Sequence, residues 1–106
     1  MTVHQLCEKL PLVSINHEED RVVTGVFCCD LLSVAMAKAP EDSAWVTVIG
    51  NANTVAVATL ADVACIVLAE GFSYDETAIS AAKGKIELLK SEKPTYETAV
   101  SIGALM

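Results

Sequence analysis

Two asparagine side chains follow an apolar segment at the point where a helix is expected to begin. The segment Ala44–Ile49 leads into Gly50, Asn51, Ala52 and Asn53. The first N–H groups of a helix have no partners inside the helix, so an anion or a small polar ligand can bind there. Asparagine is also a common helix N-cap. The turn therefore has two interpretations, a ligand site that includes Asn51 and Asn53, or a cap formed by Asn53.

Further polar and glycine positions follow other expected strands. Glu70–Gly71 comes directly after the apolar segment Ala64–Ala69, and Ser91 follows the last expected strand. Ligands of open α/β sheets bind at the carboxyl ends of the strands, so these residues join the asparagine turn as ligand-binding candidates. Thr24–Gly25 interrupts another strand and belongs either to the same rim or to a bulge elsewhere.

No residue pattern indicates catalysis, a cofactor or a metal site. The chain lacks a G-x-S-x-G nucleophile turn, a phosphate-binding G-x-x-x-x-G-K-[ST] loop and a G-x-G-x-x-G dinucleotide motif. His4 is expected on the polar side of a first helix and His17 in a charged loop. Neither has a Cys or carboxylate at metal-ligand spacing, which predicts solvated surface histidines.

The four cysteines are expected to be reduced thiols that act as small buried apolar residues. Cys28 and Cys29 are adjacent on an expected strand, so their side chains point to opposite faces. Cys7 lies on the apolar stripe of a helix and Cys65 within an apolar strand. A chain without a signal peptide is expected in the cytoplasm, where thiols stay reduced.

Length and charge narrow the class of protein. The 106 residues predict a single domain, 1–106, and 53% of them are hydrophobic whereas only 5% are aromatic. Lys and Arg number 7 against 14 Asp and Glu, a formal net charge of -7. This charge disfavours nucleic-acid polymers and anionic membrane surfaces as partners. No apolar run reaches the roughly 20 residues that span a bilayer.

The periodicity of apolar residues predicts strands alternating with helices. Asp30 is the expected N-cap of the second helix, and Ser73 with Glu76 has the spacing of a capping box. Expected strands are Leu12–Ile15, Val22–Cys29, Ala44–Ile49, Ala64–Ala69 and Ile86–Leu89; expected helices are Val3–Leu10, Leu31–Ala39, Thr54–Ala61, one ending near Lys83 and Pro94–Ala104. This order predicts an α/β fold with a mostly parallel sheet and helices on both faces.

Two of the expected helices are apolar nearly all round. Leu31–Ala39 has only Ser33 and Lys38 as polar residues, and Thr54–Ala61 has only its two threonines. A helix of this kind is buried on nearly all sides, and a chain of this size has difficulty covering two. At least one is therefore expected in the interface of a homodimer, unless the N- and C-terminal helices cover the excess.

In this order of segments the chain resembles the DRTGG domain family. The likeness covers Val22 to about Ile102 and rests on VVTGVFCCDLLS (Val22–Ser33), on Glu41–Gly71 and on LLKSEKPTYETAVSI (Leu88–Ile102). It looks closest to the short stand-alone members of anaerobic bacteria. Related domains occur in phosphotransacetylases and regulated family II pyrophosphatases and resemble the N-terminal domain of HPr kinase/phosphorylase. The resemblance implies a three-layer α/β/α domain, dimeric and regulatory.

The resemblance also bears on the ligand. The family has an arginine-containing turn after the central strand and a Thr-Gly-Gly-like end after the next, whereas this chain has Gly50–Asn53 and Ala69–Gly71. Without that arginine, and with Glu70 nearby, a neutral or cationic ligand is favoured over a polyphosphate. We expect a non-catalytic homodimer that docks on a partner enzyme or signalling protein; the alternative is a small-ligand sensor, with an adenine nucleotide as one candidate.

Overall fold

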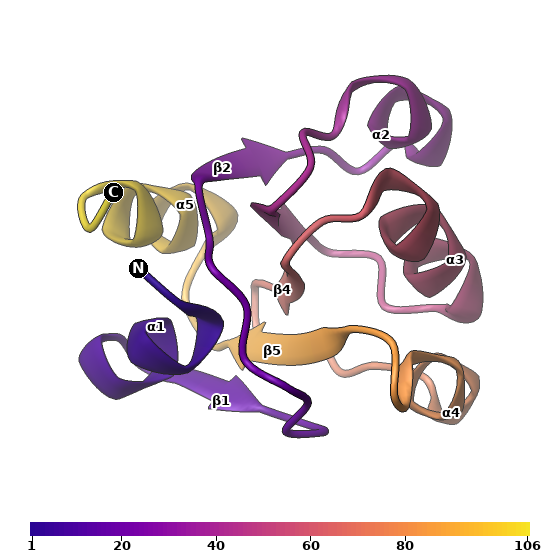
Figure 1. Cartoon of the computed structure of the whole chain (residues 1–106), viewed down its shortest axis with the longest axis horizontal. Helices are drawn as coiled ribbons and strands as arrows, with labels where there is room; N and C mark the ends of the chain where they lie inside the picture. The colour runs from indigo at the N-terminus through magenta and orange to yellow at the C-terminus, as the bar shows by residue number, and fades with distance from the viewer.

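The computed structural model describes all 106 residues and contains five helices and five strands (Figure 1). In chain order they are α1 (Val3–Lys9), β1 (Leu12–Ser14), β2 (Gly25–Cys28), α2 (Leu32–Lys38), β3 (Ser43–Thr47), α3 (Ala52–Ala61), β4 (Cys65–Leu68), α4 (Glu76–Ala82), β5 (Glu87–Ser91) and α5 (Thr95–Gly103). The longest helix, α3, has 10 residues, and no helix is long and apolar enough to cross a membrane. The mostly parallel α/β fold predicted from the sequence is confirmed.

The strands form one sheet in the order β1-β5-β4-β3-β2. β2, β3, β4 and β5 are parallel, and β1 pairs antiparallel with β5 at one edge. β2 forms the other edge and pairs only with β3. Because β3, β4 and β5 are covered on both faces, their side chains are buried almost without interruption, as is typical of parallel strands in three-layer folds.

The helices form two layers, one on each face of the sheet. Helices α2, α3 and α4 lie on one face and α1 and α5 on the other (Figure 1). The core is divided accordingly: Trp45 and Ile66 belong to the cluster under α2, α3 and α4, and Val46 and Val67 to the cluster under α1 and α5. Trp45 is fully buried, and its indole N–H donates to Cys29 O at 2.9 Å.

The bounds of most elements agree with the prediction to within two residues, but β2 is shorter than expected. It begins at Gly25, and Val22 lies outside it, in an isolated antiparallel bridge with Thr2. The backbone N–H of Val23 donates to Met1 O. The segment before Gly25 therefore pairs with the N-terminus of the chain instead of extending β2.

Asp30 does not cap α2. The N-cap is Leu31, which makes no side-chain cap hydrogen bond. The Asp30 carboxylate instead accepts from the Thr47 hydroxyl at 2.9 Å and from the Val48 backbone N–H at 3.0 Å. It thus fixes the end of β3 to the end of the neighbouring β2, a tertiary role that residue type alone does not distinguish from capping.

The predicted capping box of Ser73 and Glu76 is also absent. α4 begins at Glu76, its N-cap is Asp75, and no side chain caps it. Ser73 instead accepts a hydrogen bond from the Lys90 ammonium at 3.2 Å. The segment between β4 and α4 is anchored to β5 by Tyr74, whose buried hydroxyl donates to Leu89 O at 2.7 Å. That contact fixes where the helix can begin.

Candidate functional site

The asparagine turn after β3 is occupied by structural hydrogen bonds. Asn51, and not Asn53, is the N-cap of α3, and its side-chain oxygen accepts from the Thr54 backbone N–H at 3.1 Å. Gly50 is closely packed, since a Cβ there would lie 2.9 Å from a Leu68 methyl carbon and 3.2 Å from the Tyr74 Cα. Asn53 is exposed on the first turn of the helix. The turn thus anchors α3 and leaves Asn53 as its free polar side chain.

Glu70, Gly71 and Ser91 lie together at the carboxyl ends of β4 and β5, on the side of α5. The Glu70 carboxylate accepts from the Thr95 backbone N–H at 2.7 Å, and Gly71 N–H donates to Ser91 O at 3.0 Å. The Ser91 and Thr98 hydroxyls are hydrogen-bonded at 2.8 Å in a buried contact. These groups hold the first turn of α5 against the sheet.

The structure does not join the candidate residues into one pocket. β3 and β4 end at the same edge of the sheet, as predicted, but the Asn51 side chain caps α3 whereas Glu70 contacts α5 in the opposite layer. None of the three surface hollows is lined by the asparagine turn, by Glu70 or by Gly71, and Ser91 lines one of only about 10 Å³. Such a volume holds at most about one water.

Thr24 and Gly25 lie at the other end of the sheet. Gly25 opens β2 beside Ser43, the first residue of β3, and the Thr24 N–H donates to Asp42 O at 2.9 Å. The amino ends of parallel strands lie at the same end of the sheet. Thr24 and Gly25 are therefore separated from the asparagine turn by the length of β3.

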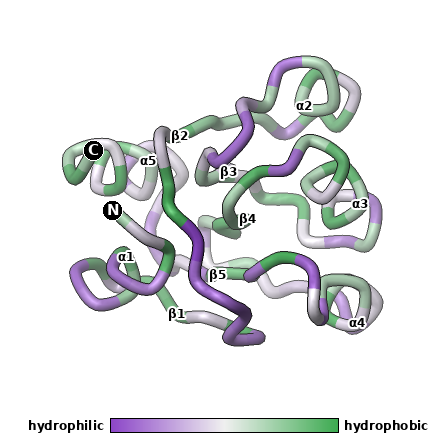
Figure 2. Tube along the Cα trace, viewed as in Figure 1, coloured by the Kyte–Doolittle hydropathy of each residue, from purple (hydrophilic) through white to green (hydrophobic).

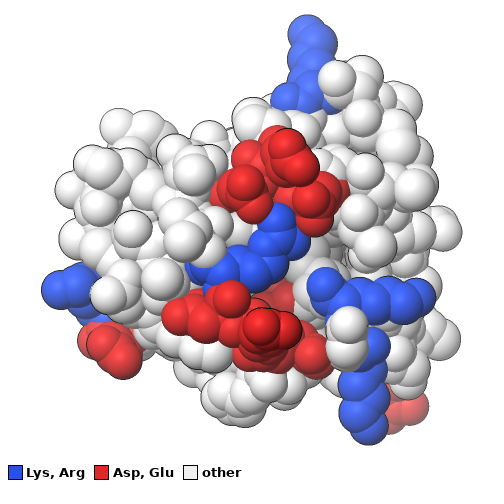
Figure 3. All heavy atoms as spheres, in the orientation of Figure 1, with Lys and Arg blue, Asp and Glu red and all other residues white.

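Arg21 organises the amino-terminal edge of the sheet, a role that sequence reasoning missed. Its guanidinium donates to the Asp42 carboxylate at 2.6 Å, to the Asp62 carboxylate at 3.1 Å and to the carbonyl oxygens of Asp62 and Val63. Burial opposes the charge, but the hydrogen bond donated to Asp42 and the charge of Asp62 raise the pKa of Arg21. Figure 3 shows basic side chains between acidic groups on this face.

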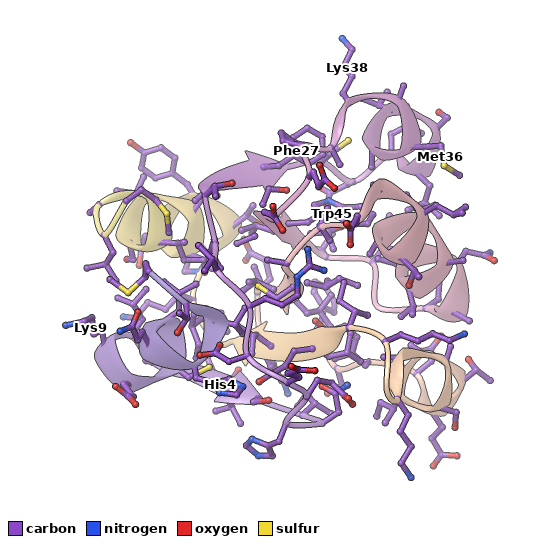
Figure 4. All side chains as sticks on the ribbon, viewed as in Figure 1. His4, Lys9, Phe27, Met36, Lys38 and Trp45 are labelled. Atoms are coloured by element: carbon purple, nitrogen blue, oxygen red, sulfur yellow. The ribbon has the colours of Figure 1, made fainter.

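His4 lies at the surface, as the sequence predicts, with 42% of its side chain exposed, but it also contacts a buried carboxylate that the sequence analysis did not foresee. Its Nε2 lies 2.9 Å from the carboxylate of Glu87, which is 2% exposed. The same carboxylate accepts from the Ser14 hydroxyl at 2.6 Å and from the Glu18 backbone N–H at 3.1 Å. Figure 4 shows His4 below α1, and its partner Glu87 is the first residue of β5. The available sequence signal was an acidic residue within the otherwise apolar segment Ile86–Leu89.

Two neighbouring hollows border this network. One, of about 250 Å³, lies between Glu18–Arg21 and Gly84–Glu87; the other, of about 450 Å³, is lined by Asn16, His17 and α4. The most buried polar groups of the first, Glu87 and Arg21, already have protein partners. No group of three His, Cys, Asp or Glu side chains is arranged to hold a metal ion. These hollows offer no convergent set of free polar groups.

The four cysteines are free thiols, as predicted, but they are not all buried. Cys65 is fully buried, Cys7 and Cys29 are half-buried, and Cys28 is exposed. Burial raises the pKa of Cys7 to about 11 and also raises that of Cys65. A raised pKa keeps a thiol protonated and unreactive at neutral pH.

The most distinctive surface lies on α2. Ala35 is its only buried residue, while Leu31, Val34 and Met36 have exposed fractions of 60%, 36% and 49%; we call these three residues the α2 surface. The one charged side chain of the helix, Lys38, extends away from the molecule, and Met36 lies on the outer side of α2 (Figure 4). In Figure 2, α2 is largely apolar and the loop between β1 and β2 is the most hydrophilic segment in view.

No protein-family model matches the chain, and no curated protein matches its sequence. Function is therefore inferred from the geometry described above.

Proposed function

We propose that this chain is a non-catalytic regulatory and interaction module that forms a homodimer and docks on a partner enzyme or signalling protein. The observation that supports this proposal is the α2 surface, which exposes Leu31, Val34 and Met36 on a helix that buries only Ala35. Leu31 and Val34 are three residues apart and so lie on one side of the helix, and neighbouring exposed apolar residues on a globular chain are typical of interfaces. We also propose that the protein is located in the cytoplasm and that it belongs to a DRTGG-like family.

The other apolar helix is covered only in part. α3 buries Thr54, Val55, Val57 and Ala58 and lies between α2 and α4, but it leaves Leu60 73% exposed. Of the two helices expected to require cover, α2 has the larger number of exposed apolar side chains. The α2 surface contains no acidic residue. Contact between the α2 surfaces of two copies would therefore bury no unpaired carboxylate, whose desolvation is costly.

The alternative, a small-ligand sensor at Gly50–Asn53, has less support. The capping role of Asn51 and the close packing of Gly50 account for both residues, and no hollow opens at the turn.

Light scattering at micromolar concentration tests the homodimer. We expect the wild type at twice its chain mass of 11.2 kDa and the variant Val34→Glu as a monomer with unchanged circular dichroism. A carboxylate buried in the interface should raise the dissociation constant at least about tenfold, which corresponds to 1.4 kcal/mol. The matched control is Val13→Glu, at a residue 62% exposed on the opposite edge of the sheet. A monomeric wild type would refute the proposal.

Docking on a partner is tested separately with the exposed end of the asparagine turn. Affinity capture from the native cell, followed by mass spectrometry, compares the wild type with Asn53→Arg, which leaves the Asn51 cap in place. A stoichiometric partner retained by the wild type supports docking, and its loss from Asn53→Arg would assign the turn to that contact. Absence of any partner that is retained reproducibly would contradict the docking proposal.

A further inference from the structure

β2 is an edge strand without the usual protection against pairing. It has a single neighbour, β3, and lies at the edge of the sheet with α2 on one side and α5 on the other (Figure 1). No charged residue and no proline occurs from Val22 to Cys29. Natural edge strands are commonly blocked by charges, prolines or covering segments because their free backbone groups pair with other strands.

The free backbone groups of β2 belong to Val26 and Cys28. The Cys29 N–H donates to Val46 O, on the side of β3. Because backbone groups alternate in direction along a strand, those of Phe27 also point to β3 and those of Val26 and Cys28 point away. The side chains of Val26 and Phe27 are only half-buried, although they pack against opposite core clusters. A strand added at this edge would increase the burial of both side chains, one on each face of the sheet.

We propose that β2 pairs antiparallel with β2 of a second copy, so that two five-stranded sheets become one continuous sheet. This inference rests on the proposed homodimer and adds its geometry. A second copy fits this edge because its β2 presents the same free groups, and because the segment Val22–Ala39 contains one acidic and one basic residue, Asp30 and Lys38. The net charge of -7 is carried elsewhere on the chain.

The neighbouring helices extend the contact. Leu31, Val34 and Lys38 lie three and four residues apart, which places them on one side of α2, and Lys38 points beyond the β2 edge (Figure 4). On the other face of the sheet α5 packs against β2 and β3 and exposes Tyr96 and Val100. A two-fold axis perpendicular to the sheet at β2 therefore brings apolar side chains of both helical layers near the partner.

Symmetry restricts the register of the pairing. With this two-fold axis, residues that face each other across the pair must point to the same face of the sheet. One residue of β2 therefore lies at the axis and faces its own copy. The two central registers place Phe27 opposite Phe27, or Val26 opposite Val26, of the partner. The first brings Val26 opposite Cys28 of the second copy.

Disulfide trapping tests the pairing. Opposite residues in such a pair have Cβ atoms about 4.5–5.5 Å apart, close enough for a disulfide after small adjustment. The variant Val26→Cys should give a covalent dimer under mild oxidation in either register. Adding Cys28→Ser should remove the covalent dimer if the axis passes through Phe27 and should retain it if the axis passes through Val26. The control Val13→Cys, on β1, should remain uncross-linked.

A charge at the edge gives an independent test. Gly25→Glu has open space for its side chain and should convert the dimer to a monomer, whereas Val13→Glu, on the opposite edge strand β1, should not. A wild-type dimer in which Val26→Cys gives no covalent dimer, or in which Gly25→Glu remains dimeric, would overturn the edge pairing and leave the homodimer intact. A wild-type monomer would overturn both.

Discussion

The carboxylate of Glu70 caps α5, because its Oε2 accepts a hydrogen bond from the Thr95 backbone N–H at 2.7 Å. Glu70 has a left-handed backbone, with φ of 64°, and Gly71 follows with φ of 72°. The residue that precedes α5, Pro94, has no side chain able to cap. A side chain distant in sequence thus supplies the acceptor, and Glu70, a residue predicted to bind a ligand at the end of β4, has a structural role at a helix terminus.

Replacing Glu70 by alanine should destabilise the protein by about 1 kcal/mol, the typical effect of losing a helix cap. Glu70→Gln retains a carbonyl oxygen and should lose less. Chemical denaturation followed by circular dichroism measures both values. Glu19→Ala, at an exposed residue with no side-chain hydrogen bond in the structure, is the control and should have no measurable effect. Equal stability of Glu70→Ala and the wild type would contradict the capping role.

Stability should fall as the pH rises above neutrality. The hydrogen bond to Glu87, opposed in part by burial, raises the pKa of His4 above its ordinary value of 6.5. A group whose pKa is higher in the folded state stabilises the fold fully below its unfolded pKa and loses this contribution as pH rises through the folded pKa. Thermal midpoints measured from pH 6 to pH 9 should show the decline.

The variant His4→Gln isolates this contribution. It removes the titrating group, so the decline should become shallower, while Asp20, Glu18 and Glu87, which surround His4, remain. The control His17→Gln should retain the wild-type profile. The same pH slope in His4→Gln and in the wild type would show that the His4–Glu87 contact does not carry the pH dependence.

The layers of the fold could be predicted from periodicity, but the roles of individual polar residues could not. The spacing of apolar residues within each segment indicates whether it forms a strand or a helix, so no knowledge of distant residues is needed. The partners of Asp30, Arg21 and His4 depend instead on residues up to 83 positions away in the chain. The monomer leaves apolar side chains exposed on both helices for which incomplete cover was predicted, Leu60 on α3 as well as Val34 and Met36 on α2; their burial in an interface stays a prediction.

Gly50 should be intolerant of even one added carbon. The Cβ of Gly50→Ala would lie 2.9 Å from a Leu68 methyl carbon and 3.2 Å from the Tyr74 backbone, and overpacking of this kind costs about 1–3 kcal/mol. Gly25→Ala meets nothing within 4 Å and is the matched control. Urea denaturation should separate the two variants. Comparable stability of both would show that the end of β3 relaxes freely.

Arg21 should not be replaceable by lysine. Its two terminal nitrogens donate to four oxygens on Asp42, Asp62 and Val63, an arrangement that a single ammonium group cannot reproduce. Arg21→Lys should cost about 1.5–3 kcal/mol, as for the loss of hydrogen bonds to charged groups. The ion pairs are partly exposed, so high salt should narrow the difference from the wild type. Denaturation curves at low and high salt measure both effects, with Lys38→Arg, on the exposed α2 helix, as a neutral control. A fully stable Arg21→Lys would mean that charge alone, without the planar guanidinium, holds the amino-terminal edge together.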